Sequence, residues 1–303
     1  MKRFALIGAA GYIAPRHMKA IQDTGNVLVA AYDPYDGVGV LDNYFPEAHF
    51  FTEFERFDRH IEKLRQEGKP VDFMVICSPN HLHDSHIRFA LKSGCQVICE
   101  KPIVLNPWNL DSLLIVEAET KNRVFSILQL RLHPQIIALK RKIDEANSDQ
   151  IFTVDLKYIT ARGLWYHHSW KGNESKSGGI ATNIGIHFFD MLIWIFGEVI
   201  ESTVHSLTSD KASGELQLTK AQVKWNLSID QSDLPKEFQT RGKKVYRSIR
   251  INDEEFEFSE GFEDLHSASY REILVGNGFG LLDAKKSIEL VHQIRKQKVE
   301  DKA

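Results

Sequence analysis

The chain has 303 residues and a formal net charge of −3 at neutral pH, with 43% hydrophobic and 26% charged residues. This length suits two domains of ordinary size, and the composition is that of a globular protein. A slightly acidic chain has no general attraction for nucleic acid or for an anionic membrane surface. No apolar run approaches the roughly 18 residues of a membrane-spanning helix, and the short Lys-Arg opening is a poor signal peptide, so we expect a cytoplasmic protein with no membrane partner.

The N-terminal stretch predicts a dinucleotide-binding turn. An apolar run over residues 4–7 passes into a Gly-x-x-Gly-x-x-Ala pattern, and a predicted helix follows over residues 15–24. This order of strand, tight turn and helix lets backbone N–H groups approach a pyrophosphate at the positive end of the helix. We therefore expect four residues of this turn to contact the cofactor, namely Gly8, Gly11, Tyr12 and Ile13.

The second predicted strand, residues 27–32, ends at Asp33. It is a continuous apolar run, as expected of a parallel strand that is buried on both faces. Asp33 lies 22 residues after Gly11, near the offset of about 20 at which a carboxylate binds the adenosine ribose hydroxyls. Pro34 and Tyr35 follow it, with no arginine to receive a 2′-phosphate, so the sequence favours NAD over NADP.

Strands and helices continue to alternate, which predicts a doubly wound parallel sheet. After a loop over residues 34–46, the predicted strands cover residues 49–52, 71–77, 96–99 and 124–129, and the predicted helices cover residues 53–68, 83–93, 110–121 and 133–145. Ligands of such sheets bind at the carboxyl ends of the strands. Two of these ends are polar and give the remaining predicted cofactor residues, Ser78, Asn80, His83, Glu100 and Lys101.

From residue 151 the pattern changes to alternating apolar and polar residues, over 152–158, 221–227, 246–251 and 255–258. Alternation implies an antiparallel sheet with one covered and one freer face. We therefore predict an α/β protein with a Rossmann domain over residues 1–122. An α+β domain over residues 123–303 would bind substrate and support oligomerisation, with an open, mostly antiparallel sheet and two final helices over 266–275 and 282–296.

Cysteine and histidine content gives no convincing metal site. The three cysteines lie in apolar contexts and are expected to be buried free thiols; they are Cys77, Cys95 and Cys99. Three histidines, at 81, 83 and 86, are close in sequence, but no cysteine or carboxylate completes a zinc ligand set. We predict that the protein has no metal.

Several motifs together resemble the Gfo/Idh/MocA oxidoreductases. They are the glycine-rich opening, Ser-Pro-Asn-x-x-His at 78–83, Glu-Lys-Pro at 100–102, and the Gly-Gly…Asn-x-Gly-x-His-x-x-Asp run at 178–190. The resemblance implies oxidation of a sugar or cyclitol with a nicotinamide cofactor. More closely, ILQLR, SWKG and TNIGIHFFD resemble the UDP-N-acetyl-2-amino-2-deoxyglucuronate dehydrogenases. Those enzymes oxidise the 3-hydroxyl of UDP-N-acetylglucosaminuronate on the route to diacetylated diamino-uronic acids of bacterial surface polysaccharide, such as the lipopolysaccharide O-antigen.

The resemblance implies roles for three residues. Lys101 would stabilise the developing alkoxide, and His187 would take the hydroxyl proton. Asn183 replaces an Asp of the wider family, and it can orient a hydroxyl or an imidazole without titrating. An anionic substrate also needs cations and flat side chains to pack on the sugar or base, so the predicted substrate residues are Lys101, Arg131, Arg162, Tyr166, Trp170, Lys171, Asn183 and His187.

Two other functions stay open at this point. One is a dinucleotide-bound regulator without catalysis, against which the presence of Lys101 and His187 argues. The other is a sister dehydrogenase acting on a free sugar or cyclitol. NADH is either released in each cycle or reoxidised in place by a keto acid such as 2-oxoglutarate. The exposed face of an open sheet favours a homodimer or homotetramer.

Overall fold

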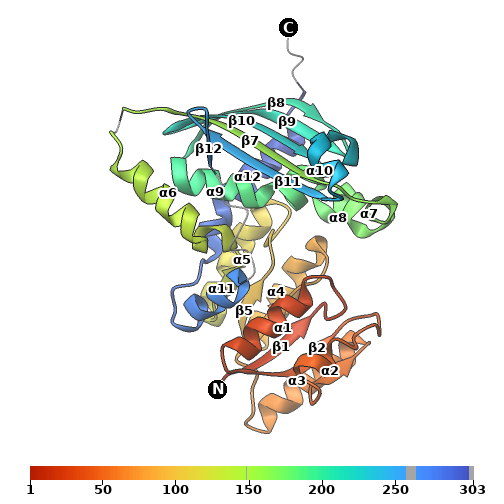
Figure 1. Ribbon diagram of the computed structural model, residues 1–303. Coiled ribbons are helices and arrows are strands. Elements are labelled where there is room, and N and C mark those ends of the chain that lie inside the picture. The colour runs from red at the N-terminus through yellow and green to blue at the C-terminus, as the bar shows by residue number, and fades with distance from the viewer. Residues whose placement is uncertain (148, 257–263, 300–303) are drawn as a thin grey trace. The chain divides into compact units, whose positions relative to one another are not determined.

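The computed structural model describes residues 1–147, 149–256 and 264–299 (Figure 1). The chain divides into two compact units. The first comprises Met1–Gln129 and Glu263–Ala284, and the second comprises Leu130–Phe262 and Lys285–Ala303. Each unit has its own sheet and its own hydrophobic core.

The first unit is built on a parallel sheet, with six strands among the described residues in the order β3-β2-β1-β4-β5-β6. The strands are β1 (Arg3–Ile7), β2 (Val27–Tyr32), β3 (His49–Phe51), β4 (Phe73–Ile76), β5 (Gln96–Cys99) and β6 (Val124–Ser126). The order reverses between β1 and β4, which is the switch point where doubly wound sheets bind ligands. The prediction of such a sheet is confirmed.

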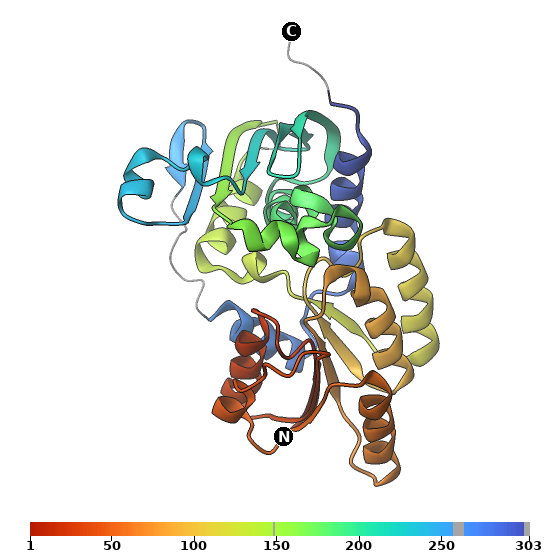
Figure 2. The same ribbon diagram turned by 90° about the vertical axis from the view of Figure 1, so that its right-hand side faces the viewer.

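Helices cover both faces of this sheet. They are α1 (Ala14–Asp23), α2 (Leu41–Tyr44), α3 (Phe54–Gln66), α4 (His83–Lys92), α5 (Pro107–Thr120) and α11 (Leu265–Leu274), with 3₁₀ turns at Asn80–Leu82 and Gln129–Leu132. Figure 2 shows the red α1 and the blue α11 on one face and the orange helices on the other. The short α2 lies in the segment predicted as a loop, where buried Leu41 anchors a single turn to the core.

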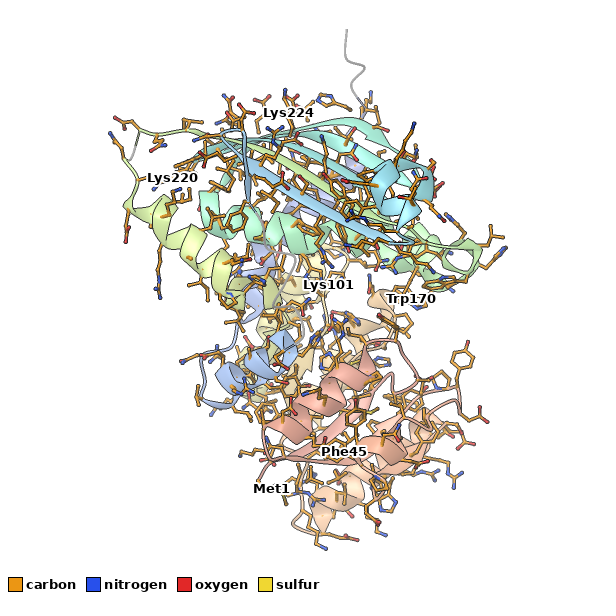
Figure 3. All side chains as sticks on the ribbon, in the orientation of Figure 1. Met1, Phe45, Lys101, Trp170, Lys220 and Lys224 are labelled. Atoms are coloured by element: carbon orange, nitrogen blue, oxygen red, sulfur yellow. The ribbon has the colours of Figure 1, made fainter. Side chains whose placement is uncertain are left out.

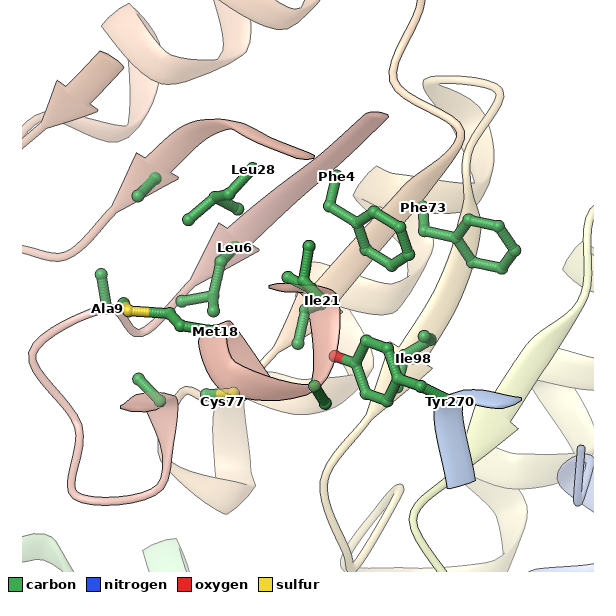
Figure 4. Close-up of a cluster of buried hydrophobic side chains, with 14 of the residues drawn as sticks. Phe4, Leu6, Ala9, Met18, Ile21, Leu28, Phe73, Cys77, Ile98 and Tyr270 are labelled. Carbon is green, nitrogen blue, oxygen red and sulfur yellow. The ribbon is translucent and has the colours of Figure 1, made fainter. Parts of the chain in front are cut away.

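The core of the first unit includes side chains from the C-terminal part of the chain (Figure 4). The Phe4 ring stacks on Phe73 at 5.1 Å and lies 5.9 Å from the ring of Tyr270, which is fully buried on α11. The predicted domain boundary near residue 122 therefore needs correction in two places. Strand β6 pairs with β5 and belongs to the first sheet, and α11 returns to the first core.

The second unit contains a mixed sheet with the order β12-β11-β7-β10-β9-β8 among the described residues. Its strands are β7 (Phe152–Thr160), β8 (Val199–Leu207), β9 (Lys211–Leu218), β10 (Ala221–Ser228), β11 (Val245–Ile251) and β12 (Glu254–Phe256). All neighbouring pairs are antiparallel except β7 and β10, which are parallel. The sequence prediction missed β8 and β9, and residues 257–258 of its last strand lie outside the described residues.

One face of this sheet is covered and the other is polar, as the alternating pattern predicts. Trp225 of β10 is buried and packs edge-on against Phe189 of the helix α9 (Ile186–Phe196), with ring centroids 5.2 Å apart. The alternate residues of β10 are exposed, including Lys224, which is labelled on the outer face in Figure 3. The expectation of an open sheet is confirmed.

The remaining helices of the chain are α6 (Pro134–Glu145), α7 (Leu164–His168), α8 (Glu174–Ser177), α10 (Lys236–Thr240) and α12 (Leu281–Lys296), with short turns at Trp170–Gly172 and Gln231–Asp233. A π-helical turn, Ala181–Gly185, precedes α9. By length and composition, the segment Glu174–Phe196 is the one candidate membrane span in the described ranges. Since 78% of its most apolar window is buried, it fits the core helix of a folded domain.

Candidate active site

The glycine-rich turn is held tightly between three strand ends of the first unit. The N–H of Gly8 donates to the Tyr32 carbonyl at 2.8 Å, and the N–H of Ala9 donates to the same oxygen at 3.2 Å. Gly8 has a φ of +94°, and a Cβ at this position would lie 2.6 Å from the carbonyl carbon of Cys77. Only glycine allows this approach, which leaves the turn at the N-terminus of α1 where a pyrophosphate binds.

Asp33 connects this turn to the end of β2. Its carboxylate accepts the backbone N–H of Ala10 and the backbone N–H of Tyr35, both at 2.9 Å, and the side chain is almost buried. A carboxylate has about four lone-pair sites, so this arrangement leaves acceptor capacity for a ribose diol. This geometry is compatible with NAD, and the roles of the turn and of Asp33 in holding it stay predictions. Tyr12 is largely exposed and Ile13 packs against the core.

His83 forms hydrogen bonds inside the first unit. The ring is 1% exposed, and its Nδ1 lies 2.7 Å from the Pro102 carbonyl while its Nε2 lies 2.8 Å from the Ser78 carbonyl. Burial lowers the pKa of His83, and the two carbonyls partly offset this effect. His83 therefore links the loops after β4 and β5 to each other. Its role as a cofactor ligand stays a prediction.

The side chain of Glu100 is also directed into the protein. One carboxylate oxygen, Oε1, lies 3.0 Å from Nε2 of His17 and 3.0 Å from Nε2 of His266, and Oε2 accepts the backbone N–H of Lys101 at 3.3 Å. Burial alone would raise the pKa of Glu100, but the two histidine hydrogen bonds outweigh it and hold the pKa well below its usual range. The Glu100 carboxylate thus contacts the backbone of Lys101 from inside the first unit, and the role of Glu100 as a cofactor contact stays a prediction.

Lys101, Ser78 and Asn80 lie at the carboxyl ends of β4 and β5, as expected. Lys101 is half-buried, and Ser78 and Asn80 are more than nine-tenths buried. The hydroxyl of Ser78 lies 2.9 Å from Nδ1 of His86. These ends flank the switch point of the sheet, so the structure keeps them as candidate cofactor residues.

Asn183 and His187 occupy a special position in the second unit. Between Ala181 and Asp190 every residue is buried except these two, which are half-buried. Asn183 lies in the π-helical turn and His187 in the first turn of α9. Single π-helical turns are rare and occur frequently at functional sites. An amide and an imidazole four residues apart therefore face one surface of an otherwise apolar helix.

Tyr166 on α7 contacts the first of these residues. Nδ2 of Asn183 donates to the Tyr166 hydroxyl at 2.9 Å, and Tyr166 is 3% exposed. Burial raises the pKa of Tyr166, so the phenol stays protonated at neutral pH. The hydrogen bond fixes which way the Asn183 amide faces.

The aromatic loop around α7 also contains a lysine. Nζ of Lys171 lies 4.9 Å from the ring centroid of Trp165 and 5.7 Å from that of Trp170. Burial lowers the pKa of Lys171, and the nearby charge of Arg162 lowers it further. Lys171, next to the two indole rings, and Arg162 carry positive charges that repel each other. An anion bound between them would relieve this repulsion.

Arg131 does not join these cations. Its guanidinium donates two hydrogen bonds to Asp190, Nε to Oδ2 at 2.9 Å and Nη2 to Oδ1 at 2.8 Å. The side chains of Arg131 and Asp190 are 8% and 4% exposed. The pair joins the turn at Gln129–Leu132 to α9, and the role of Arg131 in substrate binding stays a prediction.

Sequence reasoning missed the histidines that hold Glu100. No local pattern marks His17, and the one available signal for α11 was the spacing of four between His266 and Tyr270. Within the described residues, His17, Glu100 and His266 are the one His/Cys/Asp/Glu group whose ligand atoms lie close enough to hold a metal ion. The cysteines are free and buried, as predicted.

Comparison with known proteins identifies relatives of both units. The family model GFO_IDH_MocA, described as an oxidoreductase family with an NAD-binding Rossmann fold, matches residues 2–128, and its C-terminal alpha/beta domain model matches residues 140–228. The chain is 49% identical to the WlbA (WbpB) dehydrogenase of Thermus thermophilus, with a TM-score of 0.96 over 100% of this chain and 97% of that one. That protein was crystallised with NAD and alpha-ketoglutarate, and separately with NAD and UDP-GlcNAcA.

Curated relatives match over a smaller part of their length. Inositol 2-dehydrogenase of Rhizobium meliloti is 27% identical over 220 residues, which is 70% of this chain and 61% of that protein. A putative UDP-kanosamine synthase oxidoreductase subunit of Amycolatopsis mediterranei is 27% identical over 184 residues, 60% of this chain and 51% of that protein. The matched region thus spans between half and two thirds of these relatives.

Proposed function

The chain belongs to the Gfo/Idh/MocA family of NAD-binding oxidoreductases, and on that basis we propose that it oxidises the 3-hydroxyl of UDP-N-acetylglucosaminuronate to a ketone. The observation that carries this proposal is the 49% identity over the full chain with a dehydrogenase crystallised with NAD and this sugar nucleotide. The presence of Lys101 and His187 supports a catalytic protein over a regulator of the same fold.

The chemistry divides between a cation and a base. The bound nicotinamide accepts the hydride that leaves C3 of the sugar. His187 takes the hydroxyl proton, and the Lys101 ammonium stabilises the negative charge that develops on the oxygen. Asn183, oriented by Tyr166, holds the hydroxyl or the imidazole in place without exchanging protons. The turn at Gly8 and the carboxylate of Asp33 hold the pyrophosphate and the ribose of NAD.

Charge supports an anionic substrate. The protein has a net charge of −3, so a sugar nucleotide with a pyrophosphate and a carboxylate must be bound by locally concentrated cations. Arg162 and Lys171 form such a pair, and Trp165 and Trp170 beside Lys171 offer flat surfaces for a sugar or a base. Both cations are assigned to substrate binding in this proposal.

The proposal extends to the setting of the reaction. The alpha-ketoglutarate in a structure of the Thermus relative supports 2-oxoglutarate as the acceptor that reoxidises NADH in place. We assign the product to synthesis of diacetylated diamino-uronic acids for surface polysaccharide, in a cytoplasmic enzyme. The polar open face of the second sheet supports a homodimer or homotetramer.

Product analysis tests the proposal. With UDP-N-acetylglucosaminuronate, NAD and 2-oxoglutarate, we expect the keto sugar nucleotide and the reduced keto acid, 2-hydroxyglutarate, to form in equal amounts with no net change in nicotinamide absorbance. UDP-N-acetylglucosamine should be turned over poorly, because an unpaired cation in the site is costly when the carboxylate is missing. His187→Asn and Lys101→Met should each lose on the order of 10²-fold in kcat. The exposed residues His49 and Lys63 offer matched controls as H49N and K63M. Equal kcat/KM for UDP-N-acetylglucosaminuronate and UDP-N-acetylglucosamine would contradict the proposal and indicate a sugar dehydrogenase of broader specificity.

A further inference from the structure

Four polar side chains form a linear hydrogen-bond chain inside the first unit. Tyr270 Oη lies 2.8 Å from His17 Nδ1, His17 Nε2 lies 3.0 Å from Glu100 Oε1, and His266 Nε2 lies 3.0 Å from the same oxygen. All four residues are more than nine-tenths buried. They come from α1, α11 and the end of β5, three elements that are far apart in the sequence.

The chemistry of the partners assigns the hydrogens in this chain. An ionised carboxylate only accepts, so Nε2 of His17 and Nε2 of His266 must both carry a proton. Burial lowers the pKa of His17, which keeps its ring neutral and leaves Nδ1 as an acceptor for the Tyr270 hydroxyl. Every polar atom of His17 is therefore satisfied by one tautomer.

Simple docking of α11 on α1 does not require this chain. The two helices are already joined by the Ser267 hydroxyl, which donates to Asp23 at 2.7 Å, and by the packing around Tyr270. Apolar side chains at 17, 100 and 266 together would dock the helices without the cost of burying a carboxylate. A buried polar network that ends at Glu100 is instead well placed to fix the next residue, because the second carboxylate oxygen accepts the backbone N–H of Lys101 at 3.3 Å.

We propose that His17, His266 and Tyr270 are positioning residues, which hold the Glu100 carboxylate rigid and ionised so that Lys101 is presented in one fixed place for hydride transfer. This inference rests on the proposed function only in taking Lys101 as the group that stabilises the alkoxide. The network contacts the backbone of Lys101 through Glu100, so we expect it to act on the rate of the chemical step and not on binding of the sugar nucleotide.

Kinetics of matched variants test the inference. His17→Leu and His266→Leu should each lower kcat on the order of 10-fold, the usual effect of losing an outer hydrogen-bond partner at a site. The KM for the sugar nucleotide and the Kd for NAD should stay within roughly twofold, and Gln at either position should restore much of kcat because its amide can donate to Glu100. Ser267→Ala is the control, since it removes a bond between the same helices without touching the network. Leu variants that fold and retain wild-type kcat would overturn the inference.

A second measurement is independent of turnover and of folding of the Leu variants. Nitrogen NMR of histidine-labelled protein should show a neutral His17 with the proton on Nε2, and Tyr270→Phe should change that signal while the fold is kept. A cationic His17, or the other tautomer, would contradict the assignment. Stoichiometric zinc in the purified protein would also overturn it, because the three ligand atoms lie within 4.8 Å of one another. Failure of the sugar assay with unmutated protein would count against the proposed substrate, whereas the NMR result would still decide the network.

Discussion

Replacement of Arg131 separates a structural ion pair from a substrate ligand. Arg131→Met would leave the Asp190 carboxylate, which is 4% exposed, buried without its two guanidinium hydrogen bonds. Loss of one partner of a buried pair costs about 3–5 kcal/mol. Each kcal/mol lowers the melting temperature of a domain of 150–250 residues by about 2–4 °C, so the second unit should melt roughly 6–20 °C lower. Thermal and urea unfolding followed by circular dichroism measure this change.

The double variant R131M/D190L is the control for this prediction. It removes both charges and keeps apolar volume, and such replacements of a buried pair are often neutral or stabilising. It should therefore recover most of the lost stability. Unchanged unfolding of Arg131→Met, together with a raised KM for the sugar nucleotide, would refute this reasoning and return Arg131 to the substrate site.

Three further predictions concern the first unit. Gly8→Ala should weaken NAD binding by on the order of 10-fold or more and destabilise the fold, because an alanine is strained at φ +94° and its Cβ would lie 2.6 Å from the Cys77 backbone. Isothermal titration measures the affinity and melting curves measure the stability. Near-normal affinity for NAD would contradict the prediction. Asp33→Ala should lower the affinity for NAD and reduce the preference for NAD over NADP. Titration of the unmutated protein and the variant with both cofactors measures this, and equal affinities of the unmutated protein for NAD and NADP would contradict the prediction. Burial lowers the pKa of His86 from 6.5 to about 4. As the pH falls, His86 is therefore protonated in the unfolded chain at a higher pH than in the folded protein. Stability should be complete above pH 6.5 and fall by up to about 3 kcal/mol towards pH 4. Urea unfolding of His86→Gln should show a flatter pH dependence over that window, and an equal slope would exclude His86 as its source.

Local sequence patterns were sufficient to predict those elements whose structure depends mainly on the residues of one segment. The apolar run of β2 and the alternation of β10 follow from burial on two faces and on one face, and both strands form where predicted. Gly8 could be predicted because the tight turn between the first strand and the first helix requires a glycine. The positions of Asn183 and His187 on one helical surface also follow from their spacing.

Long-range partners account for what the sequence did not show. Strand β9, with the sequence KASGELQL, contains a glycine and three charged or amide residues, and it is stabilised by pairing on both sides with β8 and β10. The bond between Arg131 and Asp190 spans 59 residues, and that between His266 and Glu100 spans 166. Residue type gives no information on such pairings, so Arg131 was assigned to the substrate and His17 was not noticed.

The return of α11 to the first core has a consequence for biosynthesis. Chains are made from the N-terminus at about 5–20 residues per second, and the whole of Leu130–Phe262 is synthesised after the last strand of the first sheet and before α11. At that rate the interval is roughly 7–27 s. During it, the surface of the first sheet that will contact Tyr270 has no partner, and Glu100 lacks the histidine of α11. The nucleotide-binding unit therefore begins to fold first on the ribosome, yet it is completed only after most of the second unit has been made.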